Sequence, residues 1–232
     1  MRTSLLTELL DLLAPRVCAI CQQRLAANEP LLCSRCMAEL PVTPYCESPY
    51  DNWMARLFWG QFPVEKVSAW IFFRPHSATS KMIYDLKYHG QAEKGEWIGQ
   101  LMAIRHQAYG FFDGIDAIVP VPITRRRTWT RGYNQSEQVA QGISLETHIP
   151  IYNKVIRRQH FSQSQTHQTA MTRRTNVEEA FLLTDAEKIK GKHLLIVDDV
   201  VTTGATIIAC AQELAKVEGV RISVLSIGLT KE

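Results

Sequence analysis

Residues 194–206 read Leu-Leu-Ile-Val-Asp-Asp-Val-Val-Thr-Thr-Gly-Ala-Thr. The apolar run at 194–197 is rich in branched side chains, which is typical of a buried parallel strand. Two adjacent carboxylates, Asp198 and Asp199, stand at the carboxyl end of this run, and hydroxyl side chains and one glycine follow. We expect a helix to begin at Thr206, so that the stretch forms a strand, a loop and a helix.

This order of groups suits a sugar that carries a phosphate. Asp198 and Asp199 can accept hydrogen bonds from two vicinal ribose hydroxyls. Backbone N–H groups and hydroxyls of the loop can surround a phosphate at the positive end of the following helix. Gly204 permits close approach of the backbone and a positive φ. The residues expected to hold the phosphate are Val201, Thr202, Thr203, Gly204, Ala205 and Thr206.

Other motifs that end a strand in acidic residues fit less well. A metal-binding acidic pair of the kind found in phosphate-receiver domains would need more chain than the 33 residues after Asp199. The sequence contains neither the G-x-x-x-x-G-K-S/T loop nor a G-x-G-x-x-G turn. The sugar-phosphate interpretation is therefore favoured.

The length and composition are those of an ordinary globular protein. The chain has 232 residues, of which 46% are hydrophobic and 21% charged, and this predicts one full domain with a smaller appendage. The formal net charge is only +3, but residues 125–174 contain nine Lys or Arg against two Glu. Such a local excess attracts a polyanion.

The N-terminal residues 5–13 are rich in leucine, but Glu8 and Asp11 interrupt them and no small-residue cleavage site follows. We therefore expect an amphipathic helix that ends near Pro15, rather than a signal peptide or a membrane span. Because no export signal is recognised and a thiol-rich motif follows, the cytoplasm is the expected compartment.

Two C-x-x-C pairs, separated by eleven residues, have the spacing of a four-thiolate metal site. The predicted ligands are Cys18, Cys21, Cys33 and Cys36. Disulfides are disfavoured by the expected reducing compartment. Structural zinc is the favoured metal and would supply much of the folding free energy of so short a region. Iron is the alternative metal, and Cys46 is an alternative ligand.

The middle of the chain predicts alternating strands and helices. We expect strands at 67–73, 115–122 and 151–156, and helices at 77–88, 97–108 and from 135 to about 142. A basic loop follows the second strand. Open parallel sheets bind ligands at this end of their strands, and arginine forks suit pyrophosphate oxygens. The residues of this predicted pyrophosphate site are Val121, Pro122, Arg125, Arg126, Arg127 and Arg131. The alternative is a solvated surface loop.

Residues 157–176 form a polar stretch with weak periodicity, which is typical of a functional loop, a lid or a disordered insertion. A lid would exclude water from a reactive sugar centre. Aromatic and basic side chains could instead contact a nucleic acid. The candidates for either role are Trp129, Tyr133, Arg157, Arg158, Gln165 and Arg173. No general base is assigned, and His160 and His167 are only candidates.

Taken together, these segments resemble the ComF family (ComFC and GntX-like proteins), which is related to the phosphoribosyltransferase domain of amidophosphoribosyltransferases. The resemblance covers nearly the whole chain. It is carried by the leucine-rich start with Pro15, the two C-x-x-C pairs, Leu86-Lys87-Tyr88-His89-Gly90, Val119-Pro120-Val121-Pro122, Arg131-Gly132-Tyr133-Asn134-Gln135, Gln165 with Arg173 and Asn176, and residues 194–206.

The resemblance implies an α/β fold of the type I phosphoribosyltransferase kind, a parallel sheet with flanking helices, behind a small N-terminal zinc-binding module of four cysteines. We expect residues 1–65 to form the N-terminal helix, the zinc module and a hood or linker, and residues 66–232 to form the phosphoribosyltransferase-like domain. The aromatic side chains expected to pack the hood against that domain are Trp53, Phe58, Trp59 and Phe62.

For function, the resemblance implies binding of phosphoribosyl diphosphate (PRPP) with Mg²⁺. The family is bacterial and cytoplasmic, and many members are linked to natural transformation, where they act on incoming single-stranded DNA and its uptake machinery. One hypothesis is an enzyme that transfers the phosphoribosyl group to an unidentified acceptor and releases pyrophosphate. The alternatives are a non-catalytic accessory protein that binds single-stranded nucleic acid, and a PRPP-sensing regulator.

Overall fold

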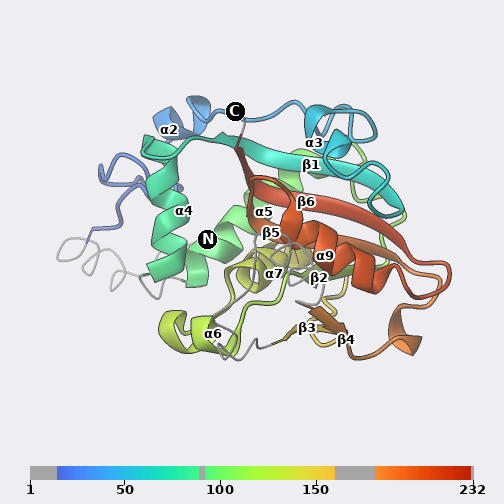
Figure 1. Cartoon of the computed structure of the whole chain (residues 1–232). Helices are drawn as coiled ribbons and strands as arrows, with labels where there is room; N and C mark the ends of the chain where they lie inside the picture. The colour runs from blue at the N-terminus through green and yellow to red at the C-terminus, as the bar shows by residue number, and fades with distance from the viewer. Residues whose placement is uncertain (1–14, 89–91, 160–180, 231–232) are drawn as a thin grey trace, which may run out of the picture.

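The computed structural model describes residues 15–88, 92–159 and 181–230. A four-stranded parallel sheet in the order β1-β6-β5-β2 lies at its centre (Figure 1). The strands of this sheet are β1 (Val64–Phe73), β2 (Ala117–Pro120), β5 (His193–Val201) and β6 (Arg221–Thr230). A separate antiparallel pair consists of β3 (Ile156–Arg158) and β4 (Phe181–Leu183).

Helices cover both faces of the sheet. Successive strand residues point to opposite faces, so Leu195 and Val197 lie in one hydrophobic core and Leu194 and Ile196 in the other. The first core is completed by α4, α5 and α7, and the second by α3, α9 and the β3–β4 pair. The helices are α2 (Ser34–Ala38), α3 (Trp53–Arg56), α4 (Ala78–Tyr88), α5 (Ala92–Gln107), α6 (Arg125–Arg131), α7 (Gln135–Thr147), the 3₁₀ turn η1 (Glu187–Ile189) and α9 (Ala205–Leu214).

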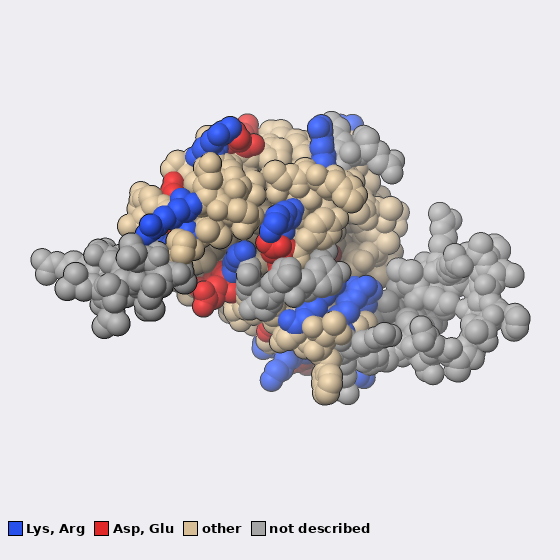
Figure 2. Space-filling view, turned by 90° about the vertical axis from the view of Figure 1, so that its left-hand side faces the viewer, with Lys and Arg blue, Asp and Glu red and all other residues tan. Residues whose placement is uncertain are grey.

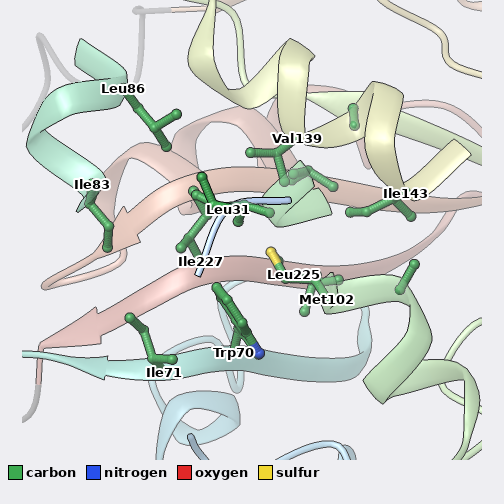
Figure 3. Close-up of a cluster of buried hydrophobic side chains, with 14 of the residues drawn as sticks. Leu31, Trp70, Ile71, Ile83, Leu86, Met102, Val139, Ile143, Leu225 and Ile227 are labelled. Atoms are coloured by element: carbon green, nitrogen blue, oxygen red, sulfur yellow. The ribbon is translucent and has the colours of Figure 1, made fainter. Parts of the chain in front are cut away.

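The cysteine-containing segment is built into the first core. Leu31 lies among side chains from α4, α7 and the sheet, as Figure 3 shows. Farther along, the backbone of residues 41–43 pairs with the edge strand β1, where Thr43 N donates to Trp70 O at 2.9 Å and Phe72 N donates to Pro41 O at 2.8 Å. This segment therefore covers one edge of the sheet, which would otherwise expose unpaired backbone groups.

Helices α5 and α7 approach each other through glycines. A Cβ atom added at Gly142 would lie 1.9 Å from Glu96 O, and one added at Gly99 would lie 2.1 Å from Val139 O. Neither distance is compatible with a side chain, because packed carbon atoms need about 3.5 Å. Glycine at these positions is what lets α7 pack closely on α5.

The observed boundaries of several helices and strands differ from the expected ones. The strand expected at 151–156 is wrong, because Ile151 makes only an isolated bridge to Ile118 and a turn at residues 153–154 precedes β3. The helix expected at 97–108 begins five residues earlier, at Ala92. Ile104, which its spacing from Ile98, Leu101 and Met102 predicts to be on the apolar face of this helix, is 58% exposed. Of the hood aromatics, Phe58 and Phe62 are buried, but Trp53 and Trp59 remain partly exposed.

His106, in the last turn of α5, is fully buried. Its Nδ1 lies 2.8 Å from Met102 O and its Nε2 lies 2.9 Å from Ser68 Oγ. Because a carbonyl oxygen can only accept, Nδ1 carries the proton and Nε2 accepts from the Ser68 hydroxyl. Burial lowers the pKa of His106 to about 4.

We expect His106 to make the fold sensitive to acid. The pKa is about 6.5 in the unfolded chain, so the stability contributed by the neutral ring is fully present above pH 6.5 and is lost as the pH falls through 4. The loss amounts to about 3 kcal/mol at pH 4. Urea unfolding gives the free energy of unfolding of the wild type and of His106→Gln. The difference between these two free energies should become smaller by this amount between pH 7.5 and pH 4. A constant difference would contradict the assignment.

Candidate functional site

The candidate site lies where β5 passes into α9. Strand β5 pairs with β6 as far as Val201, so both carboxylates belong to the end of the strand. The following helix begins at Ala205, one residue before the expected start, because Gly204 takes the N-cap position with a left-handed φ of 77°. Only glycine adopts this conformation without strain.

The loop forms a shallow, open pocket, lined by Asp198 and residues 200–207. Helix α9 has no side-chain cap, and its first amide makes only a 3.5 Å contact from Ala205 N to Thr203 Oγ1. The first-turn N–H groups therefore suit an anion, which the helix dipole also favours.

The hood residue Phe58 shapes this loop from outside. A Cβ atom at position 204 would lie 2.8 Å from Phe58 Cε1. Gly204 is thus required both by its backbone conformation and by the ring packed against it. The apolar character of Phe58 predicted that it would be buried, but nothing local in the sequence indicated that it packs against the loop between β5 and α9.

The two carboxylates are oriented by hydrogen bonds. Asp198 Oδ1 accepts from Ser136 Oγ at 3.2 Å and from Asp199 N at 2.9 Å. Asp199 Oδ1 accepts from Val200 N at 2.6 Å. Ser136 is a site residue that the sequence analysis missed, because it lies 62 positions away in the chain.

The basic segment after β2 is a helix, α6, and the loop expected there is wrong. Thr124 caps the helix by accepting from Arg127 N at 3.4 Å, and Gly132 ends it in a left-handed conformation. These two residues are ordinary start and stop signals, which the density of arginines obscured. Arg127 is exposed, and Trp129 is 93% exposed. The side chains of Arg125 and Arg126 lie outside the described part of the structure.

Residues 131–134, at the end of α6, are hydrogen-bonded to α7, to α4 and to the residue that follows β2. Arg131 Nη1 donates to Gln135 Oε1 at 2.7 Å, and Asn134 Nδ2 donates to Val121 O at 3.0 Å. Tyr133 donates its hydroxyl to Leu86 O at 2.6 Å, so the phenol is engaged within the protein. Val121 is buried and Pro122 half-buried at the end of β2.

Arg158 is a second basic side chain whose charge interacts with that of Asp198. Its guanidinium lies 5.4 Å from the ring centre of Phe181. Burial and the positive charge of Arg127 lower the pKa of Arg158, while Asp198 acts in the opposite direction. These interactions place Arg127, Arg158 and Asp198 in one electrostatic neighbourhood, although they come from α6, β3 and β5.

The other predicted contact residues are not all placed. Arg157 is exposed on β3, opposite Leu182. Gln165 and Arg173, together with the two histidines considered as general bases, lie outside the described residues. Figure 2 views the side of the molecule toward which β6 runs, and there Lys and Arg side chains lie in several groups beside Asp and Glu.

The four predicted cysteine ligands come together. Their sulfur atoms all lie within 4.8 Å of one another, and Cys21 Sγ is 3.7 Å from Cys33 Sγ. A zinc ion bonded at about 2.3 Å to four thiolates holds the sulfurs about 3.8 Å apart, so the cluster has the right size. The alternative ligand Cys46 is buried outside this cluster.

The local environment favours the thiolate at Cys18 and disfavours it at Cys21 and Cys36. Burial opposes ionisation of Cys18, but hydrogen bonds from the backbone of Cys21, Cys33 and Ile20 lower its pKa to about 7. Burial and the neighbouring thiols raise the pKa of Cys36. Such a mixture is expected where several thiols share a site, since ionisation of one opposes ionisation of the next.

No helix in the described ranges combines the length and the apolar character that crossing a membrane requires.

Comparison with known proteins identifies a family and several relatives for this chain. The phosphoribosyl transferase domain family matches residues 93–227. The DNA utilization protein YhgH of Escherichia coli O157:H7 is 29% identical over 88% of this chain and 93% of that protein. Competence protein F of Haemophilus influenzae is 35% identical over 44% of each chain.

Among solved structures, the glutamine PRPP amidotransferase of B. subtilis is 15% identical, with a TM-score of 0.42, over 61% of this chain and 30% of that chain. The family match covers more than half of the chain and spans both the glycine-packed helices and the β5–α9 loop. The expected parallel sheet with flanking helices is confirmed. The chain therefore belongs to the phosphoribosyl transferase domain family and is a ComF-family phosphoribosyltransferase-like protein.

Proposed function

We propose that this protein binds PRPP together with Mg²⁺ and transfers the phosphoribosyl group with release of pyrophosphate. One observation carries the proposal: the oriented carboxylate of Asp198 and the uncapped start of a ten-residue helix line the same pocket, and Asp199 is the neighbour of Asp198 in the chain. Ribose hydroxyls and a phosphate are the groups that such a pocket matches. The acceptor remains unassigned, since no side chain of the described site identifies it.

Different residues of the site bind different parts of the ligand. Asp198 and Asp199 accept hydrogen bonds from the ribose hydroxyls, and the backbone and hydroxyls of residues 201–206 hold the 5-phosphate. The arginines of α6, with the backbone of Val121 and Pro122, attract the pyrophosphate, whose charge their guanidinium groups neutralise as it leaves. Magnesium, when bound with the substrate, adds positive charge to the same leaving group.

The cysteine cluster is proposed to hold structural zinc. Four thiolates close a tetrahedral site and leave no position for a substrate, so this metal serves the fold rather than the reaction. It would hold the segment that covers the edge of β1 and that carries Phe58 toward the phosphate loop. We retain residues 1–65 as the proposed zinc module and hood.

Calorimetric titration with PRPP and Mg²⁺ tests the pocket. We expect saturable binding to the wild type, and a loss of about tenfold or more in affinity in Asp198→Asn/Asp199→Asn, because hydrogen bonds to charged groups contribute about 1.5–3 kcal/mol each. Asp113→Asn is the matched control, since Asp113 precedes β2 and so lies at the opposite end of the parallel strands. Absence of binding by folded wild type would refute the proposal, and unchanged affinity in the double variant would remove the ribose assignment.

A role with single-stranded DNA in competence is the second proposed function, placed in the cytoplasm. The observation that favours it is Trp129, which is 93% exposed on the arginine-rich helix α6 and so can stack on a base. The names of the relatives, DNA utilization protein and competence protein, support the same direction.

Fluorescence anisotropy with a labelled single-stranded oligonucleotide checks this role. We expect binding that weakens with added salt, because phosphate contacts release counterions. Trp129→Ala should weaken binding about tenfold, since stacking contributes about 1–3 kcal/mol per base. Trp59→Ala, which removes a half-exposed tryptophan from the hood, is the control. Salt-independent binding would contradict phosphate contacts, and equal loss of affinity in both variants would contradict a stacking role for Trp129.

A further inference from the structure

The first turn of α7 contacts both halves of the proposed ligand site, and this inference rests on the proposed function. Gln135 reaches the arginine side through Arg131, while its neighbour Ser136 reaches the ribose side through Asp198. The two side chains are consecutive in the chain, so one rigid helical turn joins a cationic group from α6 to a carboxylate from β5.

Gln135 is buried to 1% exposure and holds Arg131 through its Oε1. Its Nε2 is buried as well and has no hydrogen-bond partner in the described part of the chain. A buried donor without an acceptor costs about 1–3 kcal/mol, so its retention calls for a reason. The amide therefore uses its oxygen to hold the Arg131 guanidinium, and that bond is the one interaction of the Gln135 side chain that the described part of the structure shows.

Ser136 fixes the opposite side. Its hydroxyl donates to Asp198 Oδ1, which also accepts from Asp199 N, so this oxygen is held from two directions. The backbone N–H of Ser136 donates to Asn134 Oδ1, the side-chain cap of α7. The carboxylate is thus oriented by the positive end of a 13-residue helix.

The turn itself is anchored at two further points, the bond from Tyr133 to Leu86 O on α4 and the bond from Asn134 to Val121 O at the end of β2. Such anchoring leaves little freedom for either side chain of the turn. The geometry is that of a support for ligand-binding groups, in which supporting hydrogen bonds hold the contacting side chains in a productive orientation.

We propose that Gln135 and Ser136 are positioning residues: Gln135 orients Arg131 toward the pyrophosphate of PRPP, and Ser136 orients Asp198 toward the ribose. The two halves of the ligand are then recognised through neighbouring residues with separable effects. Each substitution should weaken binding of one half of the ligand and leave binding of the other half unchanged.

Isothermal titration with two fragments separates these effects. Inorganic pyrophosphate with Mg²⁺ probes the arginine side, and ribose 5-phosphate probes the carboxylate side, with PRPP and Mg²⁺ as the whole ligand. We expect Gln135→Met to lower the affinity for pyrophosphate about tenfold and to leave the affinity for ribose 5-phosphate unchanged. Ser136→Ala should do the reverse, and Ser136→Thr, which retains the hydroxyl, should restore binding. Gln141→Met on the same helix is the control.

The outcomes distinguish this inference from the proposed function. If the wild type does not bind PRPP, the proposed function fails. If the wild type binds PRPP but each variant lowers the affinity for both fragments equally, or for neither fragment, the positioning roles are overturned and the turn serves only the fold. Circular dichroism establishes folding of each variant. Should Gln135→Met not fold, the Ser136→Ala and Ser136→Thr pair still decides the ribose side.

Discussion

Replacement of Gly142 by alanine is expected to destabilise the protein by about 3 kcal/mol, although alanine is the better helix former by up to about 1 kcal/mol. The added Cβ would lie 1.9 Å from Glu96 O and 2.9 Å from Gln100 N. Both are backbone atoms of α5, so rotation of a side chain cannot relieve the steric clash. The helices must separate, and the core that α5 and α7 form against the sheet loses its packing.

Urea unfolding followed by circular dichroism measures this loss. The matched control is Leu145→Ala, because Leu145 lies on the same helix but is 54% exposed, and substitutions at such positions change stability by about 0.5 kcal/mol or less. Equal stabilities of the wild type and Gly142→Ala would show that the two helices are not packed as closely as described. The fold of the ligand site depends on this contact, since α7 also carries the residues that reach Asp198 and Arg131.

Removal of the metal is expected to have the second large effect. We expect the purified protein to contain one zinc per chain, and Cys18→Ser to lose it and to lower the free energy of unfolding by about 4 kcal/mol, the stabilisation that a ligand gives at about a thousand times its Kd. Cys18 is buried in the core, and its sulfur accepts from Cys33 N at 3.4 Å. Loss of the metal therefore loosens packing around Leu31 and beside β1.

Inductively coupled plasma mass spectrometry gives the metal content and separates zinc from iron. Cys46→Ser provides the control, because Cys46 is equally buried but stands outside the four-sulfur cluster. It should retain the metal. Full metal content in Cys18→Ser, or an unfolding curve that chelation leaves unchanged, would contradict a structural metal at these four sulfurs.

What the sequence determined by itself is local. The strand, loop and helix at 194–206 could be predicted because the groups that make the pocket are contiguous in the chain. The paired cysteines could be predicted for the same reason, since the two cysteines of each pair are only three positions apart in the chain. The α6 helix could also have been predicted from Thr124 and Gly132, but the run of arginines between them was interpreted as a loop.

Only the tertiary structure decided which distant residues complete the site. Ser136 donates to Asp198, Phe58 lies against Gly204, and the charge of Arg158 interacts with that of Asp198. Each of these contacts joins segments that the β-strand order brings together, and no periodicity within either segment encodes them. Composition and spacing specify what a stretch of chain can form, whereas the sheet order and the glycine-mediated helix packing decide what it touches.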